Sequence, residues 1–348
     1  MSKVRVGIVA GGQSSEHEIS CISAAGVLAA IDREMYEPVL IGITKSGKWV
    51  LPPLDVDLSV HDKQMPQMLE SYGALSAGAA ELDIDIYFPI LHGPYGEDGT
   101  IQGLFEMIGK RYVGSGVLAS AAAMDKSFAK SIFSAHGLSV AAGVTFSKST
   151  WGSERPAAIQ KVSELGLPLF VKPARGGSSR GTTKVKSLED LLDAIEYAFE
   201  FESKVMVEAA VTGKEVECAV LHDGKSITTS PIGEIKILGS HEFYDFEAKY
   251  LDDATDVLIP ADIPADIASA IGAQAIQAFT AIGCEGLARV DFFYSNTGAI
   301  VINEINTMPG FTATSVFPKL MAAAGVTYAQ IITRLLQAAA TREAGVTR

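Results

Sequence analysis

Acidic and amide side chains recur at strand spacing in two neighbouring segments near the C-terminus, residues 286–294 and 299–306. Because side chains alternate between the two faces of a strand, Asp291 lies on one face of the first segment, and Glu304 and Asn306 share one face of the second. Two carboxylates and an amide oxygen are hard-oxygen ligands suited to Mg²⁺, which leaves its other positions to water and phosphates. On the spacing alone, the alternative is the exposed polar face of an ordinary hairpin.

The residues Ser-Asn-Thr-Gly between these segments, 295–298, predict the register of the hairpin. If these four residues close the turn, Arg289 lies opposite Glu304, and Asp291 lies opposite Ile302. The polar side chains then share one face of the hairpin, with a guanidinium beside the carboxylates.

The segment that follows the hairpin contains donors for an anion. It ends in Pro-Gly-Phe-Thr-Ala-Thr-Ser, residues 309–315. The Gly310 amide and the Ser315 hydroxyl are suited to bind an oxyanion or a carboxylate. Anion donors beside a candidate metal site favour a functional face over a merely solvated one.

A glycine-rich segment, ARGGSSRGTTKV at residues 174–185, follows a short apolar strand. Its glycines have the spacing of a P-loop, but Thr182 stands where the phosphate-binding lysine is needed. It also contains Gly-Ser-Ser-Arg-Gly, which matches a hydrolase elbow, yet that elbow precedes a helix and here a strand returns. The remaining interpretation is a flexible hairpin loop whose amides and hydroxyls close over phosphates, with Lys172 as a point positive charge.

Two further lysines are candidates for the same phosphates. Lys126 begins a predicted helix, and Lys249 lies in the polar stretch HEFYDFEAKYLDD, residues 241–253. Taken alone, each is equally consistent with an ordinary surface lysine, and the stretch is either a solvated loop or a lid over a ligand.

The elements that must position these groups fall into three units. The first alternates strands and helices, which predicts a parallel sheet with helices on its faces. The second is of α+β type, and the third runs from about residue 213 to the end. The expected strands are 4–10, 38–44, 84–91, 167–172, 204–211, 216–221, 286–294 and 299–306; the expected helices are 18–31, 100–108, 125–136, 188–201, 265–282 and 327–342, with a loop or insertion at 64–80 and a segment of unassigned type at 228–237.

Composition narrows the class of function. The chain has 348 residues, 48% of them hydrophobic, with 28 Lys+Arg against 41 Asp+Glu and a net charge of −13. Disorder, nucleic-acid binding and binding to anionic membranes are therefore excluded as first choices. The sequence has neither a signal peptide nor an apolar run of spanning length, so a cytoplasmic protein is expected. Its cysteines, Cys21, Cys218 and Cys284, are far apart and are expected to be buried free thiols.

Seven segments in order resemble the D-alanine–D-alanine ligases of the ATP-grasp superfamily. The resemblance spans nearly the whole chain, and the set in register is far more specific than any one motif. The segments are GGQSSEHEIS (11–20), LHGPYGEDGTIQG (91–103), GSGVLASAAAMDK (114–126), VKPARGGSSRG (171–181), FYDFEAKY (243–250), ARVDFF (288–293) and INEINTMPGFTATS (302–315).

This resemblance implies a combined α/β and α+β architecture, an ATP-grasp fold with an N-terminal Rossmann-like (preATP-grasp) parallel-sheet domain. The implied domains are an N-terminal substrate domain at 1–123, a central ATP-grasp subdomain with the Gly-rich loop at 124–212, and a C-terminal ATP-grasp domain with the lid and metal site at 213–348. The implied reaction joins two D-alanine molecules, using ATP and two Mg²⁺ or Mn²⁺ ions, through a D-alanyl phosphate, for peptidoglycan precursor synthesis. The family often forms homodimers.

The resemblance also assigns roles residue by residue. Glu16 is implied to bind the ammonium of the first D-alanine, Ser315 the carboxylate of the second, and Arg289 and the Gly310 amide the oxyanion of the tetrahedral intermediate. Ser178 and Tyr250 are implied to link loop and lid to Glu16, and His92 lies in the substrate-side loop. The implied metal ligands are Asp291, Glu304 and Asn306, and the implied ATP contacts are Lys126, Lys172, Ser178, Ser179, Glu208, Ala210, Val211, Glu215, Phe243, Lys249, Phe293, Asn303 and Glu304.

Some features depart from the family or leave alternatives open. Gly176 and Arg180 stand where relatives more often carry a longer polar and an apolar residue, which affects loop dynamics rather than activity. A tyrosine at 250 favours the dipeptide over D-alanyl-D-lactate, so a D-alanine–D-lactate ligase or another ATP-grasp carboxylate–amine ligase is the alternative. A dinucleotide-binding oxidoreductase fits poorly, because VGIVAGG lacks G-x-G-x-x-G. The remaining alternative is a binding module that has kept only the fold.

Overall fold

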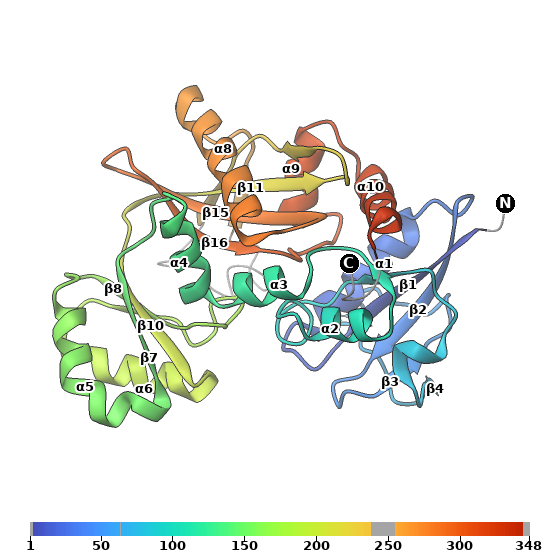
Figure 1. The fold of residues 1–348 in the computed structure, drawn as a ribbon, viewed down its shortest axis with the longest axis horizontal. Coiled ribbons are helices and arrows are strands. Elements are labelled where there is room, and N and C mark those ends of the chain that lie inside the picture. Colours follow the sequence, from blue (N-terminus) through green and yellow to red (C-terminus); the bar gives the residue numbers. More distant parts are fainter. Residues whose placement is uncertain (1–2, 63, 238–254, 344–348) are drawn as a thin grey trace.

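Three β-sheets and the helices around them form the computed structural model, which describes residues 3–62, 64–237 and 255–343 (Figure 1). The N-terminal sheet with its helices lies at one end of the molecule, and a smaller sheet with two helices lies at the other. The third sheet lies between them in the view of Figure 1. No helix among the described residues is long and apolar enough to cross a bilayer.

The N-terminal sheet has the order β4-β3-β2-β1-β5-β6. The predicted parallel sheet is confirmed, since β1 pairs in parallel with both β2 and β5, and β5 pairs in parallel with β6. The predicted loop at 64–80 contains a short strand and a 3₁₀ turn, and Met68 within it is buried. The elements are β1 (Val4–Gly11), α1 (His17–Ala30), β2 (Tyr36–Ile43), β3 (Trp49–Leu51), β4 (Gly73–Ala74), η1 (Gly78–Glu81), β5 (Ile86–Pro89), α2 (Thr100–Met107) and β6 (Arg111–Tyr112).

A second, antiparallel sheet with the order β7-β10-β8-β9 carries the Gly-rich loop between β8 and β9. The returning strand predicted after the loop is therefore present, which removes the hydrolase elbow. The segment 143–163, for which no element was predicted, forms a strand and a helix. The elements are α3 (Val117–Met124), α4 (Lys126–Ala135), β7 (Gly143–Ser147), α5 (Lys148–Ser163), β8 (Leu169–Pro173), β9 (Thr183–Val185), α6 (Leu191–Phe201) and β10 (Lys204–Ala209).

The third sheet has the order β14-β13-β11-β15-β16, with β12 paired to β11. The segment 228–237, whose type the sequence left unassigned, lies in two strands, β12 and β13, separated by Ser230, Pro231 and Ile232. The elements are β11 (Gly213–His222), β12 (Ile227–Thr229), β13 (Gly233–Ile237), β14 (Thr255–Leu258), α8 (Ala265–Ile282), β15 (Leu287–Ser295), β16 (Ile300–Asn306), α9 (Val316–Ala323) and α10 (Tyr328–Thr341).

The predicted register of the β15–β16 hairpin is wrong. Asp291 lies opposite Glu304 rather than Ile302, and Arg289 lies opposite Asn306 rather than Glu304. The Ser295 amide bonds to the Ala299 carbonyl, so the loop is one residue shorter than predicted, and an irregularity at Asp291 and Phe292 shifts the pairing by a second residue. At Arg289 and Asp291 the shift is therefore two residues, which keeps their side chains and those of Glu304 and Asn306 on one face, as predicted.

One hydrophobic core joins the N-terminal sheet to the C-terminal helices. Side chains of β1 and α1 pack in the same cluster as Leu335 and Leu336 of α10 and Phe317 of α9. Burying each such side chain stabilises the fold by roughly 1.5–3 kcal/mol. This core fixes the N-terminal domain against the third sheet. The loops of the N-terminal domain and of the third sheet therefore keep their positions relative to each other. Cys21, Cys218 and Cys284 are free and buried, as predicted.

Candidate active site

Two cavities meet between the three sheets. The smaller one, of about 470 Å³, lies between the N-terminal and third sheets. The larger one, of about 690 Å³, lies between the second and third sheets. Four residues line both cavities: Lys126, Gly176, Ser178 and Glu304. Any two ligands in these cavities would therefore approach each other at this junction.

Helix α4 brings Lys126 to the junction. The Asp125 carboxylate caps the helix by accepting bonds from the Ser127 and Phe128 amides and pairs with Lys204 at 2.8 Å. The Lys126 ammonium donates to the Gly176 carbonyl at 2.8 Å and lies 3.1 Å from the Glu304 carboxylate. Burial alone would lower the pKa of Lys126, but the Glu304 carboxylate outweighs it and the pKa is raised. Lys126 is therefore a firmly charged cation.

The base of the larger cavity holds a carboxylate between two lysines. The Glu208 Oε1 atom pairs with Lys130, and its Oε2 atom lies 2.5 Å from Lys172. Burial opposes the charge of Glu208, yet the two lysines lower its pKa to about 2. Burial lowers the pKa of Lys130 to about 8. Lys130 was missed in the sequence, although its position four residues after Lys126 places both on one helix face.

The hairpin face presents a guanidinium bound to a carboxylate. Arg289 donates to both oxygens of Asp291, each at 2.7 Å, and also lies 3.1 Å from Glu217 of β11. Burial opposes the charge of Arg289, but Asp291 and Glu217 raise its pKa well above the usual range. Glu217 is a second missed residue, which pairs directly with Asp291 across β11 and β15.

The Gly-rich loop contacts the N-terminal domain through the Ser178 side chain. The Ser178 hydroxyl donates to the Glu16 carboxylate at 2.7 Å. Ser178 and Ser179 have φ angles of 49° and 56°, in the left-handed region that disfavours residues with a Cβ. A strained backbone that is held by a contact between domains is characteristic of a loop with a functional shape.

A buried histidine holds the loop from which Glu16 projects. The His17 Nε2 atom accepts the Met68 amide at 3.0 Å, so Nδ1 carries the proton and donates to the Gly12 carbonyl at 2.7 Å. Burial lowers the pKa of His17, which keeps this neutral form. The buried Met68, in the segment 64–80, is thereby hydrogen-bonded to the start of α1.

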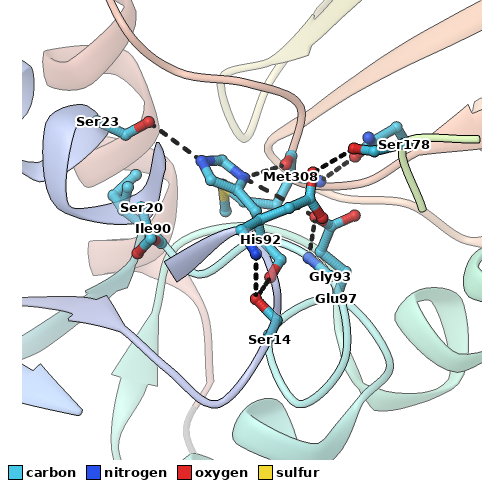
Figure 2. A network of polar contacts seen from close by, with 12 residues as sticks. Ser14, Ser20, Ser23, Ile90, His92, Gly93, Glu97, Ser178 and Met308 are labelled. Carbon is cyan, nitrogen blue, oxygen red and sulfur yellow. Dashed lines mark hydrogen bonds and ion pairs between the residues drawn. The ribbon is translucent and has the colours of Figure 1, made fainter. Parts of the chain in front are cut away.

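His92 is fixed in one tautomer at the wall of the smaller cavity (Figure 2). Its Nδ1 donates to the Met308 carbonyl at 3.1 Å, and its Nε2 accepts from the Ser23 hydroxyl at 3.1 Å. Burial lowers the pKa of His92, so the ring is neutral.

Glu97, the third residue missed in the sequence, accepts from the Gly93 amide at 2.8 Å. Burial, and then the charge of Glu16, raise its pKa well above the usual range.

The predicted anion donors line the smaller cavity next to the hairpin. The Ser315 hydroxyl lies at the start of α9 and accepts from the Thr312 amide at 3.1 Å. A Cβ added at Gly310 would lie 3.1 Å from the Ser315 Oγ atom. Such a tight approach makes glycine the fitting residue at 310, with its amide beside the serine hydroxyl.

Most of the remaining predicted nucleotide contacts line the larger cavity. Phe243, Lys249 and Tyr250 lie outside the described residues. Those that the structure brings to this cavity, in addition to the lysines and Glu208, are Ser178, Ser179, Ala210, Val211, Glu215, Phe293, Asn303 and Glu304.

The hairpin offers ligands of the type that Mg²⁺ prefers. Asp291 and Glu304 are direct partners across β15 and β16, and Asn306 is two residues further along. The Asn306 Oδ1 atom accepts the Met308 amide at 3.0 Å and keeps a second lone pair. Within the described ranges, no three His, Cys, Asp or Glu side chains form a metal-binding cluster. The donors therefore fit an ion that takes most of its ligands from phosphate and water.

Family models match both halves of the chain. One described as the D-ala D-ala ligase N-terminus matches residues 5–115, and one described as the D-ala D-ala ligase C-terminus matches residues 132–337. These ranges contain the substrate-side loop, the Gly-rich loop and the hairpin.

Relatives of similar length match over nearly the whole chain. The D-alanine–D-alanine ligase of Kineococcus radiotolerans is 46% identical, with 99% of this chain and 98% of the relative covered. That of Mycobacterium avium is 45% identical with the same coverage. Among solved structures, VanG D-Ala:D-Ser ligase from Enterococcus faecalis has a TM-score of 0.83 at 35% identity, covering 97% of this chain and 100% of that chain. The D-alanine–D-alanine ligase from Coxiella burnetii has a TM-score of 0.78 at 30% identity, covering 99% and 95%.

Removing the charge of Asp125 should make the free energy of unfolding decrease less steeply as the pH is lowered. Burial opposes the charge of Asp125, but Lys204 and the helix amides outweigh burial and lower the pKa of this carboxyl group. The ionised Asp125 therefore stabilises the fold fully above the pKa it has in the unfolded chain, and this stabilisation is lost as the pH falls through the lower pKa of the folded state. Asp125→Asn keeps an N-cap side chain but loses the ion pair, whereas Asp125→Ala also loses the cap, at a cost of about 1–2 kcal/mol. Urea unfolding from pH 6 to pH 3 should show a shallower decline for the asparagine variant; curves parallel to the wild type would contradict this.

Proposed function

The chain belongs to the D-alanine–D-alanine ligase family, and from that premise we propose which of its residues carry out the reaction. It has the ATP-grasp fold and catalyses the ATP-dependent joining of two D-alanine molecules to D-alanyl-D-alanine for peptidoglycan synthesis. The carboxylate of the first D-alanine attacks the γ-phosphate, and the amine of the second attacks the resulting D-alanyl phosphate. ADP and phosphate leave.

The larger cavity binds ATP and the smaller one binds the two D-alanine molecules. The observation that carries this assignment is that both cavities are lined by Lys126, Gly176, Ser178 and Glu304. A γ-phosphate in one cavity and a carboxylate in the other then meet beside the Lys126 ammonium. Phosphoryl transfer depends on positioning and charge neutralisation, which this junction supplies without a protein nucleophile.

Residues of the larger cavity divide between the phosphates and the nucleoside. Lys126, Lys172, the amides of Ser178 and Ser179 and the Ser179 hydroxyl bind phosphate oxygens. The adenine and ribose lie along the end of β10, the start of β11 and the hairpin, against Glu208, Ala210, Val211, Glu215, Phe293 and Asn303. Phe243 and Lys249 remain predicted contacts, and Tyr250 remains the predicted partner of Ser178 and Glu16.

Asp291, Glu304 and Asn306 would hold the two Mg²⁺ or Mn²⁺ ions. These ions, when bound, neutralise the phosphate oxygens and orient the γ-phosphate. Asp291 has lone pairs left for such an ion beside its bonds from Arg289, and Glu217 also stays beside the guanidinium. Arg289 lines the smaller cavity.

Residues of the smaller cavity hold the two amino acids. The Glu16 carboxylate binds the ammonium of the first D-alanine, and Ser178 keeps that carboxylate in place. The neutral His92 positions the 92–97 loop. Arg289 and the Gly310 amide bind the oxyanion of the tetrahedral intermediate, and the Ser315 hydroxyl binds the carboxylate of the second D-alanine. The amino-acid site therefore combines the N-terminal domain (1–123) and the C-terminal domain (213–348), and the central domain (124–212) closes it.

Product specificity follows from the second amino acid. Incubated with ATP, Mg²⁺ and D-alanine alone, the protein should release phosphate and form D-alanyl-D-alanine in equal amounts. Adding D-lactate should give little mixed product, because the attacking group is an amine and D-lactate offers a hydroxyl in its place. No phosphate release with D-alanine, together with turnover once D-lactate is added, would assign the chain to the D-alanine–D-lactate ligases instead.

Removing the charge of Glu304, which lines both cavities, should abolish turnover and leave the fold intact. Glu304→Gln keeps a hydrogen-bond acceptor for Lys126 but loses the metal-binding charge, so kcat should fall at least about 100-fold. The binding of Mn²⁺ in the presence of ADP, followed by electron paramagnetic resonance, should weaken in parallel. The matched control is Glu285→Gln, which changes a partly exposed carboxylate between α8 and β15. This variant should keep kcat within about twofold of the wild type. Undiminished activity of Glu304→Gln would refute the metal assignment.

A cytoplasmic homodimer is the proposed state, since ATP is available in the cytoplasm and the chain exposes apolar groups on neighbouring helices. Met107 of α2 is 87% exposed, and Leu118 of α3 is 79% exposed. Leu118→Glu should convert a dimer into monomers in sedimentation equilibrium. The control is Leu188→Glu, which changes an exposed leucine between β9 and α6 and should leave the dimer intact. A monomeric wild type, or a dimeric Leu118→Glu variant, would contradict this interface.

A further inference from the structure

The phosphate-binding lysines are already paired before a nucleotide arrives. Lys126 lies 3.1 Å from Glu304, and Lys172 lies 2.5 Å from Glu208. For Lys172 to contact a phosphate, it has to leave the Glu208 carboxylate. Nucleotide binding is therefore an exchange of ion pairs rather than the capture of an anion by free cations.

The exchange would be costly if Glu208 had no other partner. Glu208 is 3% exposed, so water does not replace a departing ammonium. Leaving a buried charge without its partner is strongly unfavourable. A lone Glu208–Lys172 pair would therefore hold Lys172 away from the nucleotide.

Lys130 provides the second partner. Its ammonium pairs with the Glu208 Oε1 atom, on the side of the carboxylate opposite the Oε2 atom that faces Lys172. It projects from α4 one turn after Lys126, and it is 6% exposed. Because the Asp125 cap and the packing of α4 fix the helix, Lys130 stays with Glu208 when Lys172 moves.

We propose that Lys130 is a positioning residue that retains the charge of Glu208 and so releases Lys172 to the phosphates of the nucleotide. This rests on the proposed function, in which the larger cavity binds ATP. Lys130 acts through Glu208 and Lys172 and need not contact the nucleotide. Its removal should weaken the binding of phosphate-bearing ligands and leave the base pocket unchanged.

The first test compares ligands with and without phosphates on the full-length protein. Calorimetry without metal and without D-alanine would measure the affinity of Lys130→Met for ATP and for adenosine. The affinity for ATP should fall at least about 10-fold, and that for adenosine less than about twofold, because adenosine requires no exchange of Lys172. Lys130→Arg, which restores the charge, should recover ATP affinity to within about threefold. Lys130→Gln, whose amide still donates to Glu208, serves as a second neutral variant if Lys130→Met does not fold.

The second test asks whether the effect passes through Glu208. In a Glu208→Gln background Lys172 is no longer held, so adding Lys130→Met should change ATP affinity by less than about threefold. The same loss in both backgrounds would show that Lys130 binds phosphate directly, and would overturn the proposal. Equal losses for ATP and adenosine, or wild-type affinities in Lys130→Met, would also overturn it. A wild-type protein that does not bind ATP would instead refute the proposed function.

Discussion

Buried charges have to be neutralised where the two cavities meet, and the rest of the site is arranged around this constraint. Carboxylates and cations at the junction pair with one another: Glu304 with Lys126, Glu208 with Lys130 and Lys172, and Asp291 with Arg289. Each pair neutralises groups that the proposed function assigns to phosphate, metal or oxyanion. The acidic excess of the chain is thus compatible with a polyanionic ligand, because a few cations are gathered from distant segments.

The fold serves to bring these segments together. Helix α4 contributes two of the lysines, the hairpin contributes Arg289 and the acidic face, and the Gly-rich loop reaches Glu16 of the N-terminal domain through Ser178. The core shared by α1, α9 and α10 keeps the N-terminal domain against the third sheet. The smaller cavity therefore exists only in the assembled chain, which explains why its residues are spread from position 16 to position 319.

The sequence predicted elements and faces better than it predicted pairings. Alternating strands and helices gave the parallel sheet, and the polar face of the hairpin was found from its period of two. The register was wrong because the loop is one residue shorter than predicted and the strand irregularity shifts the pairing by one more residue, and neither has a clear signal. Helix α5 was missed because Gly152 and Pro156 interrupt its pattern, although the structure accommodates both. Lys130, Glu217 and Glu97 were missed because only the tertiary fold places them beside Glu208, Asp291 and Glu16.

The central claim is that a carboxylate in the smaller cavity attacks a phosphate in the larger one at the junction. It is tested most directly by supplying D-alanine labelled with ¹⁸O in its carboxylate and analysing the released phosphate by mass spectrometry. Attack through an acyl phosphate transfers one labelled oxygen to each phosphate, since that oxygen leaves with phosphorus when the second amine attacks. Phosphate without label, with the oxygen that leaves the first carboxylate released as water instead, would contradict the account.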